Sequence, residues 1–317
     1  MKGKRPFPKL DLARLTLTNL EERPSKVSSE AAARPPQAGD AFADFWRGLP
    51  DVLAAKDLRA LVGDVAQAHR GGKTVVAGIG GHVMKVGLSP LIVDLMRSGI
   101  VQAVAANGSV CIHDVELAIA GKTSEDVDAS LRDGSFGMAA ETADFILSAI
   151  KQRGPSVGLG RALGDALLER GAPHNAASML AQGAALDVPV TVHVAVGTDI
   201  IHMHPQADGA ALGAASLLDF RKFSEAIAAV TDGGVYLNFG SAVMLPEVFL
   251  KALSIARNLG YRGAFTTADF DFIRHYRPRT NVVHRPHLGS GGRGYMLTGH
   301  HELMIPLFVA GLRLALA

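Results

Sequence analysis

Val75-Val-Ala-Gly-Ile-Gly-Gly-His82 begins the segment with the strongest fold signal in the chain. The segment continues with Ser89-Pro-Leu-Ile-Val-Asp-Leu-Met96, Ile100-Val-Gln-Ala-Val-Ala-Ala106 and Asn107-Gly-Ser109. The pattern predicts a strand, a glycine-rich turn, a helix, a second strand and a polar turn. An apolar run that ends in glycines and leads into a helix is how α/β proteins bring a ligand to a helix N-terminus. Residues 75–114 therefore predict a ligand-binding α/β unit.

Strand–turn–helix units of this kind recur along the chain. Strands are predicted over residues 74–79, 100–106, 188–196, 234–239 and 264–268, with helices between and after them. Ser89 is expected to cap the helix that Pro90 begins. Residues 154–160 are expected to form a glycine-rich loop, and residues 274–293 to be irregular. Alternating strands and helices predict an α/β fold with a doubly wound, mostly parallel sheet.

The N-terminal region differs from the rest of the chain. Residues 1–40 contain scattered prolines and charges of both signs, which predicts an extended arm. Disorder and packing on a neighbouring subunit both fit this composition. Residues 41–317 are expected to form a single domain, beginning with two helices that break near Pro50.

Composition excludes several classes of protein. The chain has 317 residues, 48% of them hydrophobic, which is enough for a substantial core. A net charge of +2 gives no electrostatic case for nucleic acid or an anionic membrane as a partner. Cys111 is the single cysteine, which excludes an internal disulfide and a cysteine-based zinc site. No secretory signal or membrane span is apparent, so a cytoplasmic location is expected.

Polar residues follow most of the predicted strands, and in a parallel sheet ligands gather at the carboxyl ends of the strands. Histidines are frequent in or near these turns: His82, His113, His202, His204, His275, His300 and His301. Such histidines can serve as acid–base groups or as metal ligands. The acid–base candidates are His202, His204, His275 and Glu247. A divalent metal held by His202, His204, His300 and His301 is the alternative.

The segment from Arg274 to Arg293 is rich in arginine and histidine. Guanidinium groups suit phosphate and carboxylate ligands, so Arg274, Arg277 and Arg285 are candidates for binding an anionic substrate. A solvated loop that faces another subunit is the alternative. No Gly-x-Ser-x-Gly motif is present, and Cys111 has no evident activating neighbour, so nucleophilic serine or cysteine catalysis is disfavoured.

The turns, in their order along the chain, resemble those of the deoxyhypusine synthase family. The similarity extends from about residue 42 to the C-terminus. It rests on Gly80-Gly-His-Val-Met-Lys-Val-Gly87, Asn107-Gly-Ser109 with His113-Asp114, Gly240-Ser241-Ala242, Thr266-Thr-Ala268 with Phe270-Asp271, and His300-His301 ahead of Leu303-Met-Ile-Pro-Leu307.

The resemblance implies a Rossmann-like NAD-binding fold and a homotetramer, a dimer of dimers, with sites shared across a dimer interface. The matched turns are those that the family uses for NAD. On that basis the cofactor-binding candidates are Gly81, His82, Lys85, Asn107, Gly108, Gly240, Ser241, Thr267, Ala268 and His300.

The departures from the family indicate altered chemistry. Its Ser-Trp-Gly-Lys run, which carries the imine-forming lysine, has no counterpart here; that place falls near Leu288. The family's histidine base falls near Glu247. Arginines stand where the family has acidic residues, and like charges would repel a polyamine. The expectation is an NAD-dependent transferase or oxidoreductase that acts on a small, anionic substrate rather than on spermidine.

Three other functions remain open from the sequence. The first is the histidine-rich, metal-dependent enzyme already described. The second is a nucleotide-binding oligomer without catalytic activity. The third is aminobutyl transfer of the deoxyhypusine or homospermidine synthase type.

Overall fold

The computed structural model describes residues 7–317, which belong to two compact units, residues 1–52 and 53–317. The first six residues of the predicted arm lie outside the described part. The rest of the first unit is mostly exposed and contains the short helix α1 (Phe42–Gly48). Within this unit, Arg34 donates its backbone N–H to the Gly48 carbonyl at 2.9 Å. The predicted boundary at residues 40–41 stays a prediction.

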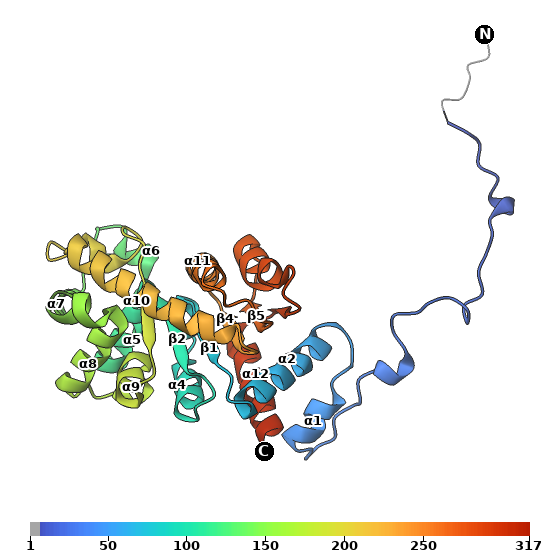
Figure 1. Ribbon diagram of the computed structural model, residues 1–317, viewed down its shortest axis with the longest axis horizontal. Coiled ribbons are helices and arrows are strands. Elements are labelled where there is room, and N and C mark those ends of the chain that lie inside the picture. Colours follow the sequence, from blue (N-terminus) through green and yellow to red (C-terminus); the bar gives the residue numbers. More distant parts are fainter. Residues whose placement is uncertain (1–6) are drawn as a thin grey trace, which may run out of the picture. The chain divides into compact units, whose positions relative to one another are not determined.

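The second unit is built on a six-stranded sheet in which every pairing is parallel (Figure 1). The strand order is β3-β2-β1-β4-β5-β6. The strands are β1 (Val75–Ile79), β2 (Ala103–Asn107), β3 (Val190–His193), β4 (Val235–Phe239), β5 (Thr266–Asp271) and β6 (Arg293–Thr298). This is the Rossmann order, so the doubly wound fold predicted from the sequence is confirmed.

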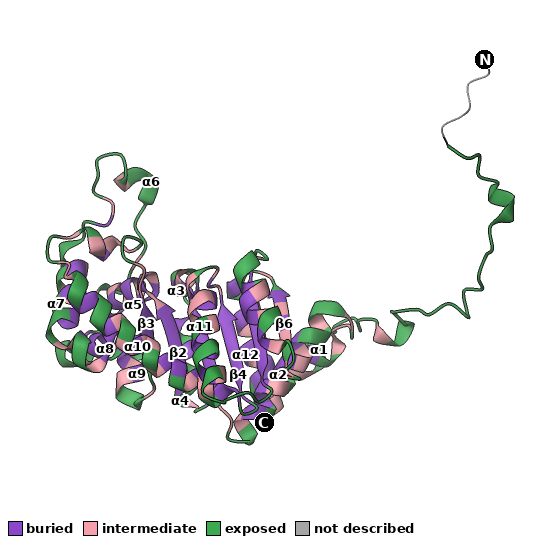
Figure 2. Ribbon diagram, turned by 45° about the horizontal axis from the view of Figure 1, so that its top comes forward, coloured by how far each residue is buried: buried purple, intermediate pink, exposed green. Residues whose placement is uncertain are grey.

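Helices cover the sheet, whose strands are mostly buried (Figure 2). They are α2 (Leu53–Arg70), α3 (Gly81–Lys85), α4 (Ser89–Arg97), α5 (Gly108–Ala120), α6 (Val127–Ser130), α7 (Ala140–Val157), α8 (Leu159–Arg170), α9 (Met179–Leu186), α10 (Gly209–Val230), α11 (Met244–Asn258) and α12 (His301–Leu316). Short apolar strands of this kind are typical of a sheet that is covered on both faces.

Strand β4 shows how the two faces are filled. Tyr236 stacks on Phe249 of α11, with ring centroids 4.2 Å apart. Phe239 packs against Phe308 of α12, with centroids 6.1 Å apart. Because side chains alternate along a strand, even and odd positions of β4 serve the helix layers on opposite faces.

Strand β3 lies at one edge of the sheet, and side chains of α10 cover its free backbone groups. The Asp219 carboxylate accepts the N–H of Val192 at 2.8 Å and that of Gly160, in α8, at 2.9 Å. Ser216 accepts the Val194 N–H and donates to the Val192 carbonyl. This edge is therefore not free to pair with another strand.

Four points of local structure differ from the predictions. Strand β6 was not predicted, and it begins at Arg293, the last residue of the segment that was expected to be irregular. Helix α7 continues through Gly154-Pro155, where a loop was expected, because Gly154 lets α7 pack closely on Ala215 of α10. Ser89 does not cap α4; its hydroxyl donates to the Ala177 carbonyl instead. Strand β5 runs on to Asp271 rather than ending at Ala268.

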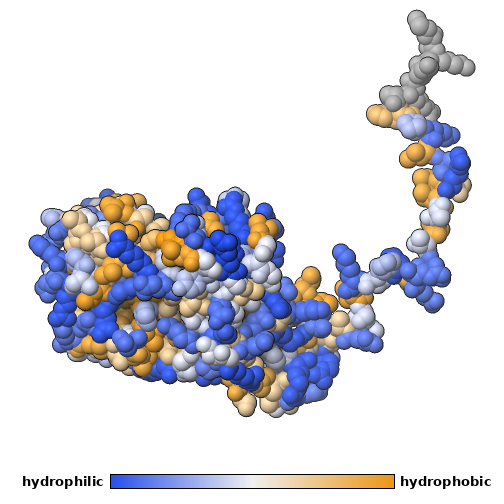
Figure 3. Space-filling model, viewed as in Figure 1, coloured by the Kyte–Doolittle hydropathy of each residue, from blue (hydrophilic) through white to orange (hydrophobic). Residues whose placement is uncertain are grey.

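Two surface properties follow from the structure. No helix among residues 7–317 is long and apolar enough to cross a membrane. Hydrophobic side chains on the face shown in Figure 3 form separate patches among hydrophilic ones.

Candidate functional site

The carboxyl ends of β1 and β4 meet at the centre of the sheet, where the strand order reverses. Gly80 donates its N–H to Phe239 at 2.8 Å, and Gly240 donates to Phe270 at 2.9 Å. A Cβ atom on Gly80 would lie 2.1 Å from the Gly240 carbonyl oxygen. Gly240 has a φ of +68°, and a Cβ there would meet the His301 ring at 2.5 Å. Both turns must therefore be glycine, and their backbones meet at the position where such sheets bind ligands.

A third turn joins this edge at the end of β2. The Asn107 side chain caps α5 by accepting the Val110 N–H at 3.2 Å. A Cβ on Gly81 would lie 2.4 Å from the Ser109 hydroxyl oxygen. The turn after β1 therefore packs directly on the first turn of α5. Three of the predicted cofactor-binding turns, those at Gly81, Asn107-Gly108 and Gly240-Ser241, lie at one edge of the sheet.

Asp199 lies over the N-terminal turn of α5. A Cβ on Gly108 would lie 1.9 Å from its Oδ2 atom, so only glycine leaves room for this carboxylate. Asp199 Oδ2 is buried and has no hydrogen-bond partner among the described residues. Burial raises the pKa of Asp199, while His202 opposes the rise.

His202 completes this corner of the site. Its Nδ1 accepts the N–H groups of Gly197 and Asp199 at 3.1 and 3.3 Å, which places the ring proton on Nε2. That Nε2 lies 3.9 Å from Asp199 Oδ2, and the two side chains are 5% and 7% exposed. Within the described part of the chain, neither atom has a hydrogen bond. An unsatisfied pair buried in this way can bind a polar group of a ligand.

His113 on α5 is held by a chain of hydrogen bonds. Thr123 donates its hydroxyl to Glu116, so its oxygen accepts the Nδ1–H of His113 at 2.7 Å. This bond leaves Nε2 of His113 as the unprotonated nitrogen. Burial, with a smaller contribution from Lys85, lowers the pKa of His113 from 6.5 to about 4. The imidazole is therefore neutral at pH 7 and able to accept a proton.

Asp199 and His113 line a cavity of about 280 Å³ at the carboxyl ends of β2 and β3. Its polar lining includes Lys85, Ser109, His113, Thr198 and Asp199. A concave site that brings together perturbed titratable groups is the expected form of a ligand-binding site.

A second group of predicted residues lies at the ends of β5 and β6. The His82 ring is 5.4 Å from the rings of both Phe272 and His301, and the His300 ring stacks on Phe272 at 6.0 Å. His301 is buried and donates from Nε2 to the Phe270 carbonyl, which leaves its Nδ1 without a partner among residues 7–317. His275 is half-buried, with its Nε2 3.9 Å from Asp271. These rings form an aromatic cluster beside the Gly240 turn.

Other predicted residues have structural contacts that occupy them. Thr267 and Ala268 lie inside β5 rather than in the turn after it; Thr267 donates to the Val282 carbonyl. Glu247 accepts hydrogen bonds from Lys251 and, at 3.2 Å, from Arg277. The bond from Lys251 and, to a smaller extent, the charge of Arg277 lower the pKa of Glu247, which weakens it as a base. His204 hydrogen-bonds to the Gly137 carbonyl at 2.9 Å.

The arginines do not form a common anion site. Arg277 is paired with Glu247. Arg285 donates to Asn281 at 2.9 Å, and Arg274 donates to Thr298 at 2.9 Å. Of the three charges expected to repel a polyamine, that of Arg277 is balanced by Glu247, whereas Arg285 and Arg274 bond to neutral side chains.

The metal-binding alternative has no support in the described residues. Within residues 7–317, no group of three or more His, Cys, Asp or Glu side chains could hold a metal ion. One ring nitrogen of each of His202, His204 and His301 is already hydrogen-bonded to a backbone group. The four proposed ligands do not form such a group.

Sequence reasoning did not select Asp199, Glu116 or Thr123, and it noted His113 without giving it a role. Asp199 could have been predicted from its position after β3, because the residues that follow this strand lie at the same sheet edge as the glycine turns. The hydrogen bonds that join Glu116, Thr123 and His113 could not be predicted from the sequence, because they form only when the loop after α5 brings Thr123 back against that helix.

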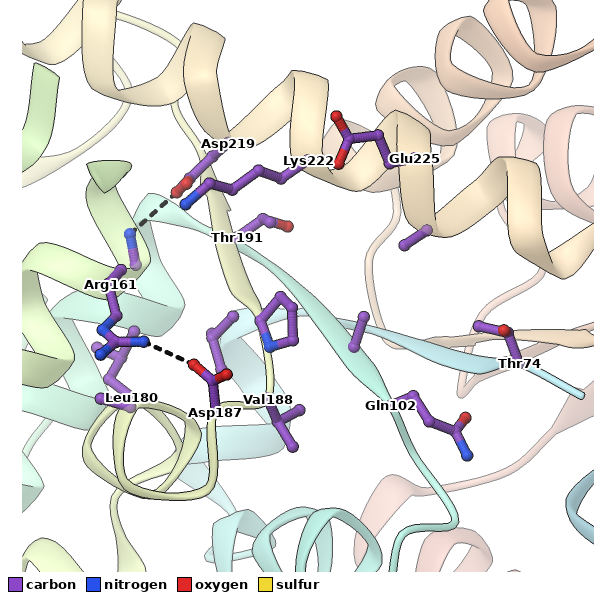
Figure 4. Close-up of a pocket in the computed structure, with 16 residues that line it drawn as sticks. Thr74, Gln102, Arg161, Leu180, Asp187, Val188, Thr191, Asp219, Lys222 and Glu225 are labelled. Atoms are coloured by element: carbon purple, nitrogen blue, oxygen red, sulfur yellow. Dashed lines mark hydrogen bonds and ion pairs between the residues drawn. The ribbon is translucent and has the colours of Figure 1, made fainter. Parts of the chain in front are cut away.

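A larger cavity of about 440 Å³ lies at the opposite, amino end of the strands (Figure 4). Asp219, Lys222 and Glu225 reach it from α10, and Arg161 is paired with Asp187 across it. Asp219 and Lys222 are already bonded to backbone groups. Since the charged groups other than the exposed Glu225 are bonded to one another or to the backbone, we place the functional site at the carboxyl edge.

Comparison with known proteins identifies the fold. No protein-family model matches the sequence, and no curated protein matches it significantly. Among solved structures, a proposed deoxyhypusine synthase from Entamoeba histolytica has a TM-score of 0.51 and 10% identity, covering 86% of this chain and 93% of its own. A proposed LOR/SDH protein from Methanococcus maripaludis S2 has a TM-score of 0.52 and 12% identity, covering 83% and 70%.

The chain is also similar to AgrE, in a complex with ornithine and NAD⁺, with a TM-score of 0.51 and 15% identity. That match covers 84% of this chain but spans only about a third, 34%, of AgrE. At these identities the similarity concerns the fold. The second unit therefore has the Rossmann-like fold that it shares with deoxyhypusine-synthase-like and AgrE-like structures.

Proposed function

We propose that the protein is an NAD-dependent enzyme of the oxidoreductase or transferase type that acts on a small charged molecule. One observation carries the proposal: the backbones of the Gly80 and Gly240 turns touch at the point where the strand order reverses. A dinucleotide binds at this place in sheets of the same order. The proposal includes a cytoplasmic location and a homo-oligomer.

The residues present fit such a cofactor. The turns at Gly81 and Gly240 lie where a cofactor phosphate would approach the backbone, whereas the Asp199 carboxylate occupies the space beside Gly108. His82, Lys85 and His300 are exposed near these turns. When bound, NAD would supply the acceptor or donor of a hydride.

The cavity beside α5 provides the acid–base groups. His113 presents a neutral Nε2, and its Nδ1–H is fixed by Thr123. Glu116 stands behind Thr123 and would stabilise the imidazolium that forms when His113 takes up a proton. Asp199 and His202 hold unsatisfied polar atoms nearby and would orient the substrate. His275 remains a second candidate for proton transfer.

The similarity to AgrE supports this proposal, because a protein with a domain of this fold has been seen with NAD⁺ and ornithine. Aminobutyl transfer is the second candidate function, since the fold is also that of a proposed deoxyhypusine synthase. The missing Ser-Trp-Gly-Lys run opposes it.

Calorimetric titration of the full-length protein with NAD⁺ and NADH tests the proposal. The wild type is expected to bind at least one of them, and Gly81→Val is expected to abolish binding because the side chain meets Ser109. Gly63→Ala is the control, since nothing lies within 4 Å of the added carbon. Circular dichroism should show that both variants are folded. Absence of binding by the wild type would refute the cofactor assignment.

A further inference from the structure

Two side chains of opposite charge line the 280 Å³ cavity, and each has a polar atom that is free to bind a ligand. Asp199 Oδ2 is buried without a hydrogen bond among the described residues, 3.9 Å from His202 Nε2, whereas Lys85 is exposed. The two do not pair with each other, although both line the same cavity. An unpaired carboxylate that is 7% exposed is costly, so this arrangement calls for a ligand that carries a positive group.

The other charged groups of the cavity are already satisfied. Glu116 accepts hydrogen bonds from Thr123 and Thr142. Glu125 accepts the Gly137 N–H at 2.9 Å. Asp199 is therefore the carboxylate that remains for a ligand, with Lys85 as the free ammonium.

Asp199 is also held in place. Gly108 leaves the space that its carboxylate occupies, and the loop residues Asp199 and His202 form a capping box in which each side chain bonds the other's backbone N–H. Since its position is fixed before a ligand arrives, Asp199 is preorganised to receive a cation.

We propose that this cavity binds a small amino acid as a zwitterion, with its ammonium group on Asp199 and its carboxylate on Lys85. His113 lines the same cavity as a neutral hydrogen-bond acceptor. The inference names a substrate class and so rests on the proposed function, but the binding event does not require NAD.

Charge distinguishes this ligand from its rivals. A dicarboxylate would bring a second negative group towards Asp199, Glu116 and Glu125. A polyamine would place an ammonium beside Lys85. A zwitterion satisfies both unpaired groups, which is the complementarity that gives specificity in binding sites.

Calorimetry of the full-length protein with three matched probes tests the proposal. L-Norvaline carries both groups, butylamine lacks the carboxylate, and pentanoate lacks the amine. Norvaline is expected to bind at least about tenfold more tightly than either of the other two. Spermidine is the fourth probe. Tighter binding of spermidine, butylamine or pentanoate than of norvaline would overturn the proposal, as would no binding of norvaline.

Two variants test separately the binding of the ligand's ammonium group and of its carboxylate. Asp199→Asn should weaken norvaline and butylamine about tenfold or more, whereas Lys85→Gln should weaken norvaline and leave butylamine unchanged. Asp232→Asn, an exposed site at the opposite end of the sheet, is the matched control. Unchanged norvaline affinity in Asp199→Asn would contradict the assignment. Titrations without NAD keep this test separate, so loss of NAD binding alone refutes only the proposed function.

Discussion

Gly108 shapes the site because it has no side chain, and the Asp199 carboxylate occupies the space that this leaves. Gly108→Ala would place a carbon 1.9 Å from Asp199 Oδ2 and displace the carboxylate. We expect this variant to lose norvaline binding to the same extent as Asp199→Asn. Gly213→Ala, with open space around the new carbon, should bind normally and be more stable by about 0.5–1 kcal/mol. Calorimetry and urea unfolding measure both effects; full binding by Gly108→Ala would contradict this reading of the site.

The titration of His113 provides a second prediction at this scale. Burial and the charge of Lys85 lower the pKa of its imidazole to about 4. The NMR signal of its Cε1 proton should therefore titrate well below pH 6. In Lys85→Gln the pKa should rise towards 6.5, because a positive charge has been removed. A midpoint near 6.5 in the wild type would show that the ring is not buried as described.

His193 couples protonation to stability. Burial lowers its pKa from 6.5 to about 3, so the folded state resists a proton that the unfolded chain accepts. Its contribution to stability is complete above pH 6.5 and is lost as the pH falls from 6.5 towards 3. At pH 5 the loss is about 2 kcal/mol for this one group. Urea unfolding at pH 7 and pH 5 should show a smaller difference in His193→Gln; an equal difference would contradict the assignment.

At this scale the sequence revealed only part of the site. The glycine turns at Gly81, Gly108 and Gly240 were predictable, because glycine after an apolar strand is a local signal. The roles of Asp199 and His113 were not, because their partners lie on other elements. Glu247 and His204 were selected by type, yet tertiary contacts already occupy them.

Among the elements, the contribution of the contact between α10 and β3 to stability can be tested directly. Asp219→Ala would leave the buried N–H groups of Val192 and Gly160 without an acceptor, at a cost of about 2–5 kcal/mol. Asp219→Asn keeps one acceptor oxygen and should cost less. Urea unfolding of both variants gives the comparison, with Asp232→Asn as an exposed control. Equal stability of Asp219→Ala and the wild type would show that α10 does not protect this edge.

The sequence predicted elements well where their signals were local. The strands near residues 75, 103, 190 and 235 were all found, because buried parallel strands form short apolar runs. Strand β6 was missed, since Arg293-Gly-Tyr-Met-Leu-Thr298 follows a glycine- and arginine-rich segment that suggests a loop. Helix α7 was ended too early at Lys151, because the cost of Gly154-Pro155 is offset by packing on α10.

For the whole molecule, the predicted oligomer can be measured directly. Exposed hydrophobic side chains occur in the loops near the carboxyl edge of the sheet, including Val196, Val243, Phe272 and Ile273. Surfaces of this kind often contact a partner. Light scattering after size-exclusion chromatography should give a mass that is a multiple of 33.2 kDa, and four copies are expected. A monomer at micromolar concentration would refute the oligomer.

The central pairing of the sheet has a consequence for synthesis. Strand β1, at residues 75–79, pairs with β4, at residues 235–239. The first half of the chain therefore leaves the ribosome with one side of β1 unpaired. The contact between the turns at Gly80 and Gly240 can form only after β4 has been synthesised. Contacts between such distant residues slow folding and expose strand edges in the meantime. A nascent chain stalled before residue 235 should be sensitive to protease and bound by chaperones, whereas one released past β4 should resist digestion.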